Sequence, residues 1–170
     1  MATEYSVVLG GGRVALAGQQ LNVGDRAPEF SLTGQDLKPV TRAGQAGRVL
    51  VIASVPSLDT GTCDIETRRF NVEAAKLGEA VRILTVSMDL PFAQKRWCGA
   101  AGVDKVLVAS DHRDASFGTA YGVLIPEVRL LARAVFVVDR GGIIRYIEVV
   151  EQTGSEPDYE RALAAVRLLV

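Results

Sequence analysis

The chain has little cysteine and almost no histidine. Its 170 residues include two cysteines, Cys63 and Cys98, and a single histidine, His112. Metal sites built from several imidazoles are therefore excluded, and a catalytic pair of cysteine or serine with histidine would have to use His112. No cysteine and histidine residues stand at the spacing of a zinc site. We expect neither a metal ion nor any other cofactor.

The sequence also lacks an excess of charge and any long apolar run. Lysine and arginine number 19 against 20 acidic residues, for a net charge of −1. That balance provides no field for holding nucleic acid or an anionic membrane. Runs such as 135–138 are too short to span a bilayer, and the first residues do not resemble a secretory signal. We expect a cytoplasmic protein that binds neither nucleic acid nor membrane.

Nothing in the composition marks a boundary between domains. The length suits one domain, and 48% hydrophobic residues are enough to form a substantial core. The sequence has no internal repeat, low-complexity segment or Pro/Gly-rich linker. We predict one domain over residues 1–170, in which residues 1–20 form an N-terminal β-hairpin extension.

Apolar periodicity predicts alternating strands and helices. A hairpin is expected at 5–17 and strands at 48–53, 81–87, 106–109, 130–139 and 143–150, with helices at 62–76, 89–99, 114–121 and 156–169. Asp89 would cap the second helix, Gly99 would close it, and Pro157 would stand in the first turn of the last helix. This order is that of an α/β thioredoxin-like fold with a central mixed sheet flanked by helices.

Cys63 falls at the start of the helix expected after the first central strand. Backbone N–H groups are unpaired there and the helix dipole is positive, so a thiolate is favoured. Phe70, Ala74 and Leu77 share the face of Cys63 at helical spacing. Cys63 should therefore lie against the core, where it is either a reactive thiol or a small buried hydrophobe.

Cys98 falls near the other end of a helix, just before Gly99. The negative end of a helix dipole raises the pKa of a thiol, so Cys98 should stay protonated until it reacts, unless it is an inert core residue. The two cysteines are too far apart in sequence for the C-x-x-C motif. A disulfide between them requires Cα atoms within roughly 7 Å, so we expect one helix end to unravel first.

Several stretches resemble one protein family. The segment Pro56–Cys63 matches the pattern P-x-x-x-T-x-x-C of the peroxiredoxins, and residues 23–30, 89–98, 132–135 and 156–160 continue the resemblance in order. Together they cover nearly the whole chain, which resembles the bacterial thiol peroxidases, the atypical two-cysteine peroxiredoxins. Residues 122–129 are more compact than the corresponding segment of many members, which leaves loop shape and substrate preference open.

The resemblance implies a thiol-dependent peroxidase that reduces hydrogen peroxide and organic hydroperoxides in antioxidant defence. It implies that Cys63 is the peroxidatic residue and Cys98 the resolving residue. The sulfenic acid on Cys63 would condense with Cys98 of the same chain, and thioredoxin would reduce the resulting disulfide. Pro56, Thr60 and Arg133 match the other active-site positions of the family, whose members form homodimers.

Each of these three residues also has an ordinary structural explanation. Arg133 interrupts an apolar run, so its guanidinium needs an anionic partner, which could be a thiolate or an acidic side chain. Thr60 could donate to sulfur or to peroxide, or it could simply cap the helix. Pro56 could shield the sulfur from water, or it could only terminate a strand.

Two other functions remain open from the sequence. The same disulfide could serve a redox-switched interaction module in which peroxide turnover is incidental. A thiol–disulfide oxidoreductase is a third possibility, although the missing C-x-x-C argues against it.

Overall fold

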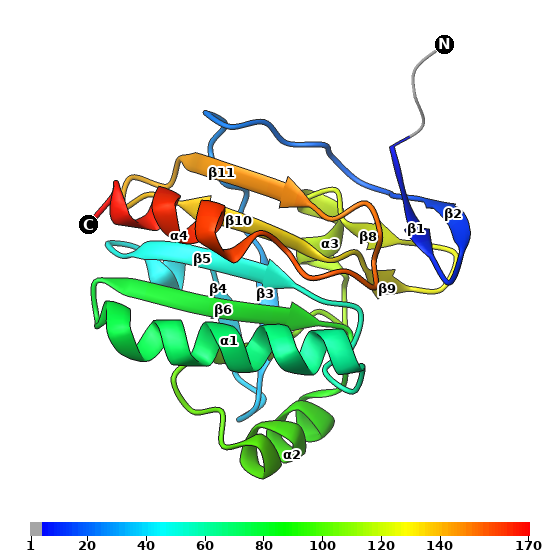
Figure 1. Ribbon diagram of the computed structural model, residues 1–170, viewed down its shortest axis with the longest axis horizontal. Helices are drawn as coiled ribbons and strands as arrows, with labels where there is room; N and C mark the ends of the chain where they lie inside the picture. The colour runs from blue at the N-terminus through cyan, green and yellow to red at the C-terminus, as the bar shows by residue number, and fades with distance from the viewer. Residues whose placement is uncertain (1–4) are drawn as a thin grey trace.

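The computed structural model describes residues 5–170, and a mixed sheet of seven strands forms its centre (Figure 1). Three neighbouring strands are parallel: β5 (Val49–Ser54), β6 (Val81–Ser87) and β7 (Leu107–Ser110). β10 (Ala134–Val138) and β11 (Ile144–Val149) continue the sheet antiparallel beyond β5. β3 (Ser31–Gly34) and β4 (Pro39–Thr41) continue it antiparallel beyond β7. The predicted mixed sheet is confirmed.

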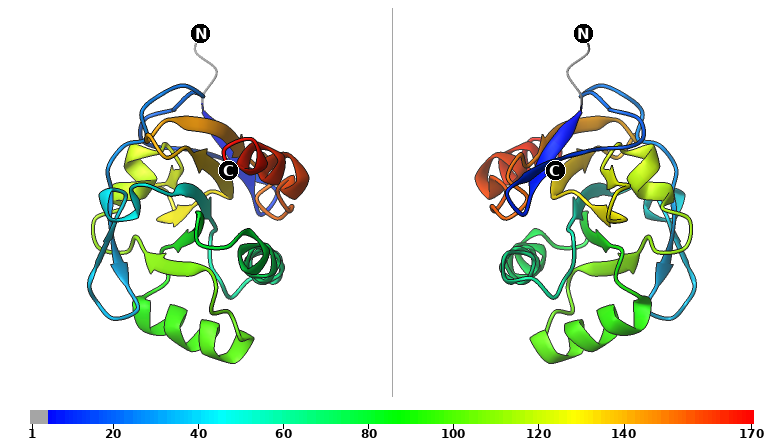
Figure 2. Two further views of the ribbon diagram at one scale, coloured as in Figure 1. Left: turned by 90° about the vertical axis from the view of Figure 1, so that its left-hand side faces the viewer. Right: turned by 90° about the vertical axis from the view of Figure 1, so that its right-hand side faces the viewer.

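Helices cover both faces of this sheet. Figure 2 shows α1 (Gly61–Leu77) and α4 (Tyr159–Arg167) on one face and α3 (Ser116–Ala120) on the other. α2 (Pro91–Ala101) follows β6 and lies beyond α1, away from α4 (Figure 1). Parallel strands require such crossover helices, because the chain must return to the same end of the sheet before it can add the next strand.

Alternation along the strands divides the core into two clusters. Val49 and Val51 of β5 point toward α1 and α4, whereas Leu50 and Ile52 point toward α3. The cluster between the sheet and helices α1 and α4 also contains both cysteines. The buried pattern of β5, in which all six residues are inaccessible, is that of a central strand covered on both sides.

The predicted N-terminal hairpin is present as β1 (Ser6–Leu9) and β2 (Gly12–Ala15). It is tied to a distant segment, because Val8 N–H donates to Glu151 O and Thr153 N–H donates to Val8 O. The chain then passes α3 at Gly18, whose φ is +100° and where a Cβ would lie 2.1 Å from the Thr119 carbonyl oxygen. Only glycine fits that close approach.

The predicted strand over 130–139 is wrong in one important respect. Residues 130–131 form β9 (Leu130–Leu131), which pairs with β8 (Leu124–Ile125), and the sheet strand β10 begins only at Ala134. Arg133 therefore lies at the break between two strands rather than within one. Residues 126–129, between β8 and β9, form a turn that the sequence did not indicate. Strands β3 and β4 and the short 3₁₀ helix η1 (Ala43–Gln45) were also missed.

Helix ends account for the other differences. α2 ends at Gly102 in the left-handed conformation, so Gly99 lies inside the helix instead of closing it. Leu90, not Asp89, is the N-cap of α2, and the Asp89 carboxylate is used elsewhere. Pro157 precedes α4, which begins after Asp158 because that side chain accepts a hydrogen bond from Arg161 N–H.

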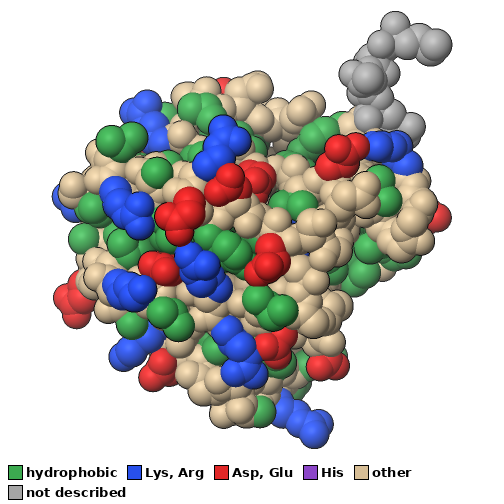
Figure 3. Space-filling view, in the orientation of Figure 1, with side chains coloured by type: hydrophobic (Ala, Val, Ile, Leu, Met, Phe, Trp, Pro, Cys, Tyr) green, Lys and Arg blue, Asp and Glu red, His purple; other side chains and the backbone are tan. Residues whose placement is uncertain are grey.

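Side chains of both charges share one face of the molecule. In the face shown in Figure 3, basic and acidic side chains are interspersed, and neither sign gathers into a patch. Within the described residues, no helix is both long and apolar enough to cross a membrane.

Candidate active site

The candidate site forms where β5 leads into α1. The chain leaves β5 at Ser54, passes the buried Pro56 and turns at residues 57–60. Thr60 has an extended backbone and accepts a hydrogen bond from Cys63 N–H at 3.3 Å, so it is the N-cap of α1. Cys63 consequently lies in the first turn, where unpaired backbone N–H groups and the helix dipole favour an anion.

Cys63 is fully buried, and its sulfur faces a cation. The residue is 0% exposed, and Arg133 Nη2 donates to Cys63 Sγ at 3.2 Å. Phe70, Ala74 and Leu77 belong to the same apolar cluster, as their spacing predicted. A charge-assisted hydrogen bond in such a dry surrounding stabilises a sulfur anion more strongly than the same bond would in water.

Arg133 is held on three sides. Besides Cys63, its guanidinium donates to Glu66 Oε2, and its Nε donates to the carbonyl oxygen of Thr153 at 2.9 Å. The side chain is 2% exposed and that of Glu66 is 0% exposed. The nearby anions outweigh burial and raise the pKa of Arg133, so it remains a fixed cation beside the sulfur.

Glu66 is a buried acid that the sequence analysis did not identify. Burial raises the pKa of Glu66 to about 7, against the opposing effect of Arg133. Only one carboxylate oxygen is satisfied, because Oε1 has no hydrogen-bond partner among the described residues. The available signal was its position three residues after Cys63, which places both side chains on the same side of α1.

Thr60 performs the structural role that its position allowed. Its hydroxyl donates to Ser57 O at 3.3 Å while it accepts from Cys63 N–H. In this arrangement the hydroxyl proton does not point to the sulfur. Thr60 therefore ties the 57–60 turn to the backbone of the nucleophile candidate.

Cys98 lies in the last turn of α2, as expected, and it is 7% exposed. Its Sγ accepts a hydrogen bond from Gln35 Nε2 at 3.6 Å rather than from any group around Cys63. Both cysteines are free thiols. The pKa of Cys98 is raised, the direction expected, but the cause is burial rather than the helix dipole, and Gln35 opposes it.

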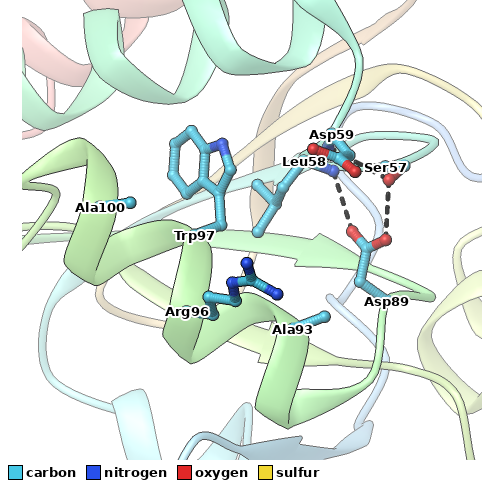
Figure 4. Close-up of a pocket in the computed structure, with 8 residues that line it drawn as sticks. All are labelled: Ser57, Leu58, Asp59, Asp89, Ala93, Arg96, Trp97 and Ala100. Carbon is cyan, nitrogen blue, oxygen red and sulfur yellow. Dashed lines mark hydrogen bonds between the residues drawn. The ribbon is translucent and has the colours of Figure 1, made fainter.

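Asp89 connects the two cysteine-bearing segments. Its carboxylate accepts from Ser57 Oγ at 2.7 Å and from Leu58 N–H at 2.9 Å, both in the turn before Cys63. Ser87 Oγ also donates to it at 2.6 Å. Figure 4 shows Asp89 hydrogen-bonded to Ser57 and Leu58 at the wall of a cavity of about 430 Å³, which is also lined by Trp97 of α2.

The structure thus brings Thr60, Cys63 and Arg133 into one hydrogen-bonded group and leaves Cys98 outside it. Within residues 5–170, no three histidine, cysteine or acidic side chains are close enough together to hold a metal ion. A buried sulfur with a fixed cation and a helix N-terminus is suited to nucleophilic attack on an electrophile that accepts electrons at oxygen or sulfur.

Comparison with known proteins gives consistent matches along the chain. The model of the Redoxin family matches residues 22–163. A thiol peroxidase of Bacillus subtilis is 53% identical over 160 residues, which are 94% of this chain and 95% of that protein. A thiol peroxidase of Staphylococcus aureus is 54% identical over 157 residues, covering 92% and 94% of the two chains.

Solved structures agree with the fold. A crystal structure of a peroxiredoxin-like protein from Aquifex aeolicus superposes with a TM-score of 0.91 at 43% identity and covers 97% of both chains. A thiol peroxidase from Chromobacterium violaceum gives a TM-score of 0.85 at 18% identity, covering 96% of this chain and 95% of that one. The second likeness bears on the fold alone, and both agree with the thioredoxin-like fold expected from the order of elements.

Proposed function

This chain belongs to the redoxin family and is a thiol-dependent peroxidase of the peroxiredoxin type; from that premise we propose that Cys63 is its peroxidatic residue and Cys98 its resolving residue. The observation that carries the first assignment is the hydrogen bond of 3.2 Å from Arg133 to the buried Cys63 sulfur. Substrates are hydrogen peroxide and organic hydroperoxides.

In the first step the Cys63 thiolate attacks one oxygen of the peroxide. The S–O bond forms as the O–O bond breaks, and the second oxygen leaves with the electron pair as hydroxide or alkoxide. Arg133 lies where it can stabilise both the thiolate and the developing negative charge on oxygen. Thr60 fixes the turn before the nucleophile, and Pro56, which is buried, shields the Cys63 sulfur from water.

In the second step the Cys98 thiol displaces the hydroxyl of the Cys63 sulfenic acid. A disulfide forms within one chain and water leaves. Thioredoxin then supplies two thiols, which reduce the disulfide and become oxidised themselves. Burial that keeps Cys98 protonated is consistent with a thiol that reacts second.

The same proposal includes the cellular role, the oligomeric state and the cofactor requirement of the enzyme. The enzyme acts in antioxidant defence in the cytoplasm as a homodimer, and residues 1–170 function as one domain. It uses no metal or other cofactor, because the thiols carry the electrons.

The mechanism is tested by mass spectrometry and rapid kinetics. We expect one equivalent of peroxide to remove two hydrogens from the monomer and to give a linked Cys63–Cys98 peptide. Cys63→Ser should abolish peroxide consumption. Cys98→Ser should react once and then fail to turn over with thioredoxin, whereas normal multiple turnover in that variant contradicts the resolving role.

A second candidate function is a redox-switched interaction module that uses the same disulfide. Cys98 lines a cavity of about 440 Å³ together with Gln35, Lys95 and Asp104, and that surface would change when Cys98 moves. A partner bound only by the oxidised protein, combined with slow turnover, would favour this function. Reduction of insulin without peroxide would instead indicate a thiol–disulfide oxidoreductase.

A further inference from the structure

The helices that carry the two cysteines are joined by contacts between the neighbours of those cysteines. Asp64, the residue after Cys63, accepts a hydrogen bond from Trp97 Nε1 at 3.1 Å, and Trp97 precedes Cys98. Arg68 pairs with Asp64 along α1 and places its guanidinium 5.9 Å from the centre of the Trp97 ring. Arg68 Nη1 also donates to Ala101 O at 3.2 Å. We refer to Asp64, Arg68, Trp97 and Ala101 as the helix latch.

The helix latch is accessible to water. The Arg68 side chain is 51% exposed and that of Asp64 is 33% exposed, while Trp97 is half-buried. Figure 4 shows the Trp97 ring rising from α2 toward α1 at the wall of the cavity. Contacts of this kind contribute modestly to stability, because solvent screens the charges and competes for the hydrogen bonds.

The other end of α2 is held by buried groups. Gln94 is 0% exposed, and its Nε2 donates to Ser87 Oγ and to Ala109 O, both at 3.0 Å. The carboxylate of Asp89, just before the helix, accepts hydrogen bonds from Ser57 Oγ, Leu58 N–H and Ser87 Oγ. The first turns of α2 are therefore anchored to β6 and β7 by buried hydrogen bonds, and breaking these would leave buried polar groups without partners.

The last turn of α2 is also intrinsically weak. Gly99 follows Cys98 inside the helix, and a Cβ at this position would meet no atom within 4 Å. Glycine in a helix interior costs free energy relative to alanine, because it loses more backbone freedom on folding. No steric requirement for glycine offsets that cost at Gly99.

We propose that the helix latch sets the rate at which Cys98 reaches Cys63, so that its four residues are positioning residues for the resolving step. This inference rests on the proposed function, in which the two cysteines form a disulfide. Opening begins at the C-terminal end of α2. There the helix latch and the Gln35 hydrogen bond add to the burial of Cys98 in the apolar cluster and to the backbone hydrogen bonds that its carbonyl oxygen accepts from Gly102 and Val103. The anchored first turns act as the pivot.

The rate of this opening determines which of two competing reactions consumes the Cys63 sulfenic acid. The sulfenic acid either condenses with Cys98 and releases water, or it reacts with a second peroxide. In the second reaction peroxide transfers an oxygen to sulfur, giving sulfinic acid and water or an alcohol. A tighter helix latch slows the first route and leaves the second unchanged, which makes the enzyme more sensitive to excess peroxide.

Arg68→Ala tests the proposal, with Arg69→Ala as a matched control. Arg69 is the adjacent arginine of α1; it pairs with Glu73 and Glu160 and lies 4.8 Å from the Tyr159 ring, so it makes the same kinds of contact toward α4. We expect Arg68→Ala to accelerate disulfide formation by about threefold to tenfold, as loss of exposed ionic and cation–π contacts allows. Arg69→Ala should leave that rate unchanged.

The readout is direct because Trp97 is the only tryptophan in the chain. Stopped-flow fluorescence follows its release after peroxide is mixed in, and rapid acid quench with thiol labelling counts the disulfide. The ratio of sulfinic acid to disulfide formed at high peroxide should fall in Arg68→Ala by the same factor as the resolving rate rises.

Gly99→Ala provides a test of opposite sign. It strengthens the last turn of α2, so disulfide formation should slow and sulfinic acid should increase. Equal resolving rates in wild type, Arg68→Ala and Gly99→Ala would overturn the proposal, and so would equal acceleration by Arg69→Ala. If wild type forms no Cys63–Cys98 disulfide at all, the proposed function fails instead, and the two failures are distinguished by mass spectrometry.

Discussion

At the residue scale, Arg133 shares its guanidinium between two acidic groups. One Nη donates to Cys63 Sγ and the other to Glu66, while Nε is occupied by the Thr153 carbonyl oxygen. The planar fork of arginine allows these three directions at once, which the single ammonium of lysine cannot reproduce. Charge alone is therefore insufficient at this position, and the geometry of the donor matters.

Arg133→Lys should consequently lower the second-order rate constant for peroxide by about 10²–10³, the range seen when one preset donor is removed from a developing oxyanion. Stopped-flow oxidation with hydrogen peroxide measures it. Arg145→Lys on β11 is the control, since Arg145 is an exposed partner of Asp139 and should leave the rate unchanged. A rate close to wild type in Arg133→Lys would show that any cation suffices.

Glu66 should make the stability of the protein depend on pH. Its pKa is about 7 in the folded state against 4.5 when unfolded, so the unfolded state releases its proton first as pH rises. The folded protein therefore loses stability between about pH 4.5 and pH 7 through this group. Arg133 opposes the shift, whereas Glu148 and Glu156 add to it.

Glu66→Gln removes this titration. The difference in unfolding free energy between Glu66→Gln and wild type should move in favour of the variant as pH rises from 4.5 to 7. Urea unfolding across that range measures it, with Glu160→Gln, whose side chain is 73% exposed, as the control. A difference that stays constant with pH would contradict the raised pKa.

At the scale of single elements, α1 depends on its cap. Thr60→Ala should destabilise the protein by about 1 kcal/mol, because Cys63 N–H loses its acceptor, and Thr60→Ser should restore most of it. Chemical denaturation measures the effect. If peroxide reactivity falls in Thr60→Ala but recovers in Thr60→Ser together with stability, the hydroxyl is needed and the methyl group is not.

Elements with strong local patterns were predicted well, and their ends less so. The β5 strand, the α1 helix and the β10–β11 hairpin follow from apolar periodicity and from the Gly141–Gly142 turn. Asp89 was predicted as a helix cap, but tertiary contacts with Ser57 and Leu58 compete for the same carboxylate and prevail. Local preference amounts to about 1 kcal/mol per cap, which such contacts can outweigh.

At the scale of the whole molecule, the N-terminal hairpin supports the candidate site from a distance. Val8 pairs with the 151–153 segment, and the carbonyl oxygen of Thr153 in that segment orients Arg133. Val7 is 1% exposed within the core on the α3 side of the sheet, so the hairpin is also packed in place. The N-terminal hairpin is thus hydrogen-bonded to the 151–153 segment, and that segment in turn holds the Arg133 guanidinium.

Deletion of residues 1–17 should therefore slow the reaction with peroxide as well as lower stability, because Thr153 loses its backbone partner. Stopped-flow oxidation at a temperature where the variant remains folded separates the two effects. Arg13→Ala removes the exposed pair with Glu151 and the exposed hydrogen bond to Ser6 Oγ, but leaves the backbone pairing of Val8 in place, and should behave like wild type. An unchanged peroxide rate in the folded deletion variant would show that Thr153 is positioned without the hairpin.

The sequence by itself determined where the two cysteines stand: Cys63 at the start of one helix, on its apolar face, and Cys98 near the end of another. Those conclusions depend on local order, since a helix start and an apolar face are set by residues a few positions apart. The tertiary structure alone decided the partners of Arg133, the placement of buried Glu66 beside it, and the contacts of Trp97 with α1. These join residues far apart in the chain, and their pairing is fixed by the packing of whole elements, which no local pattern specifies.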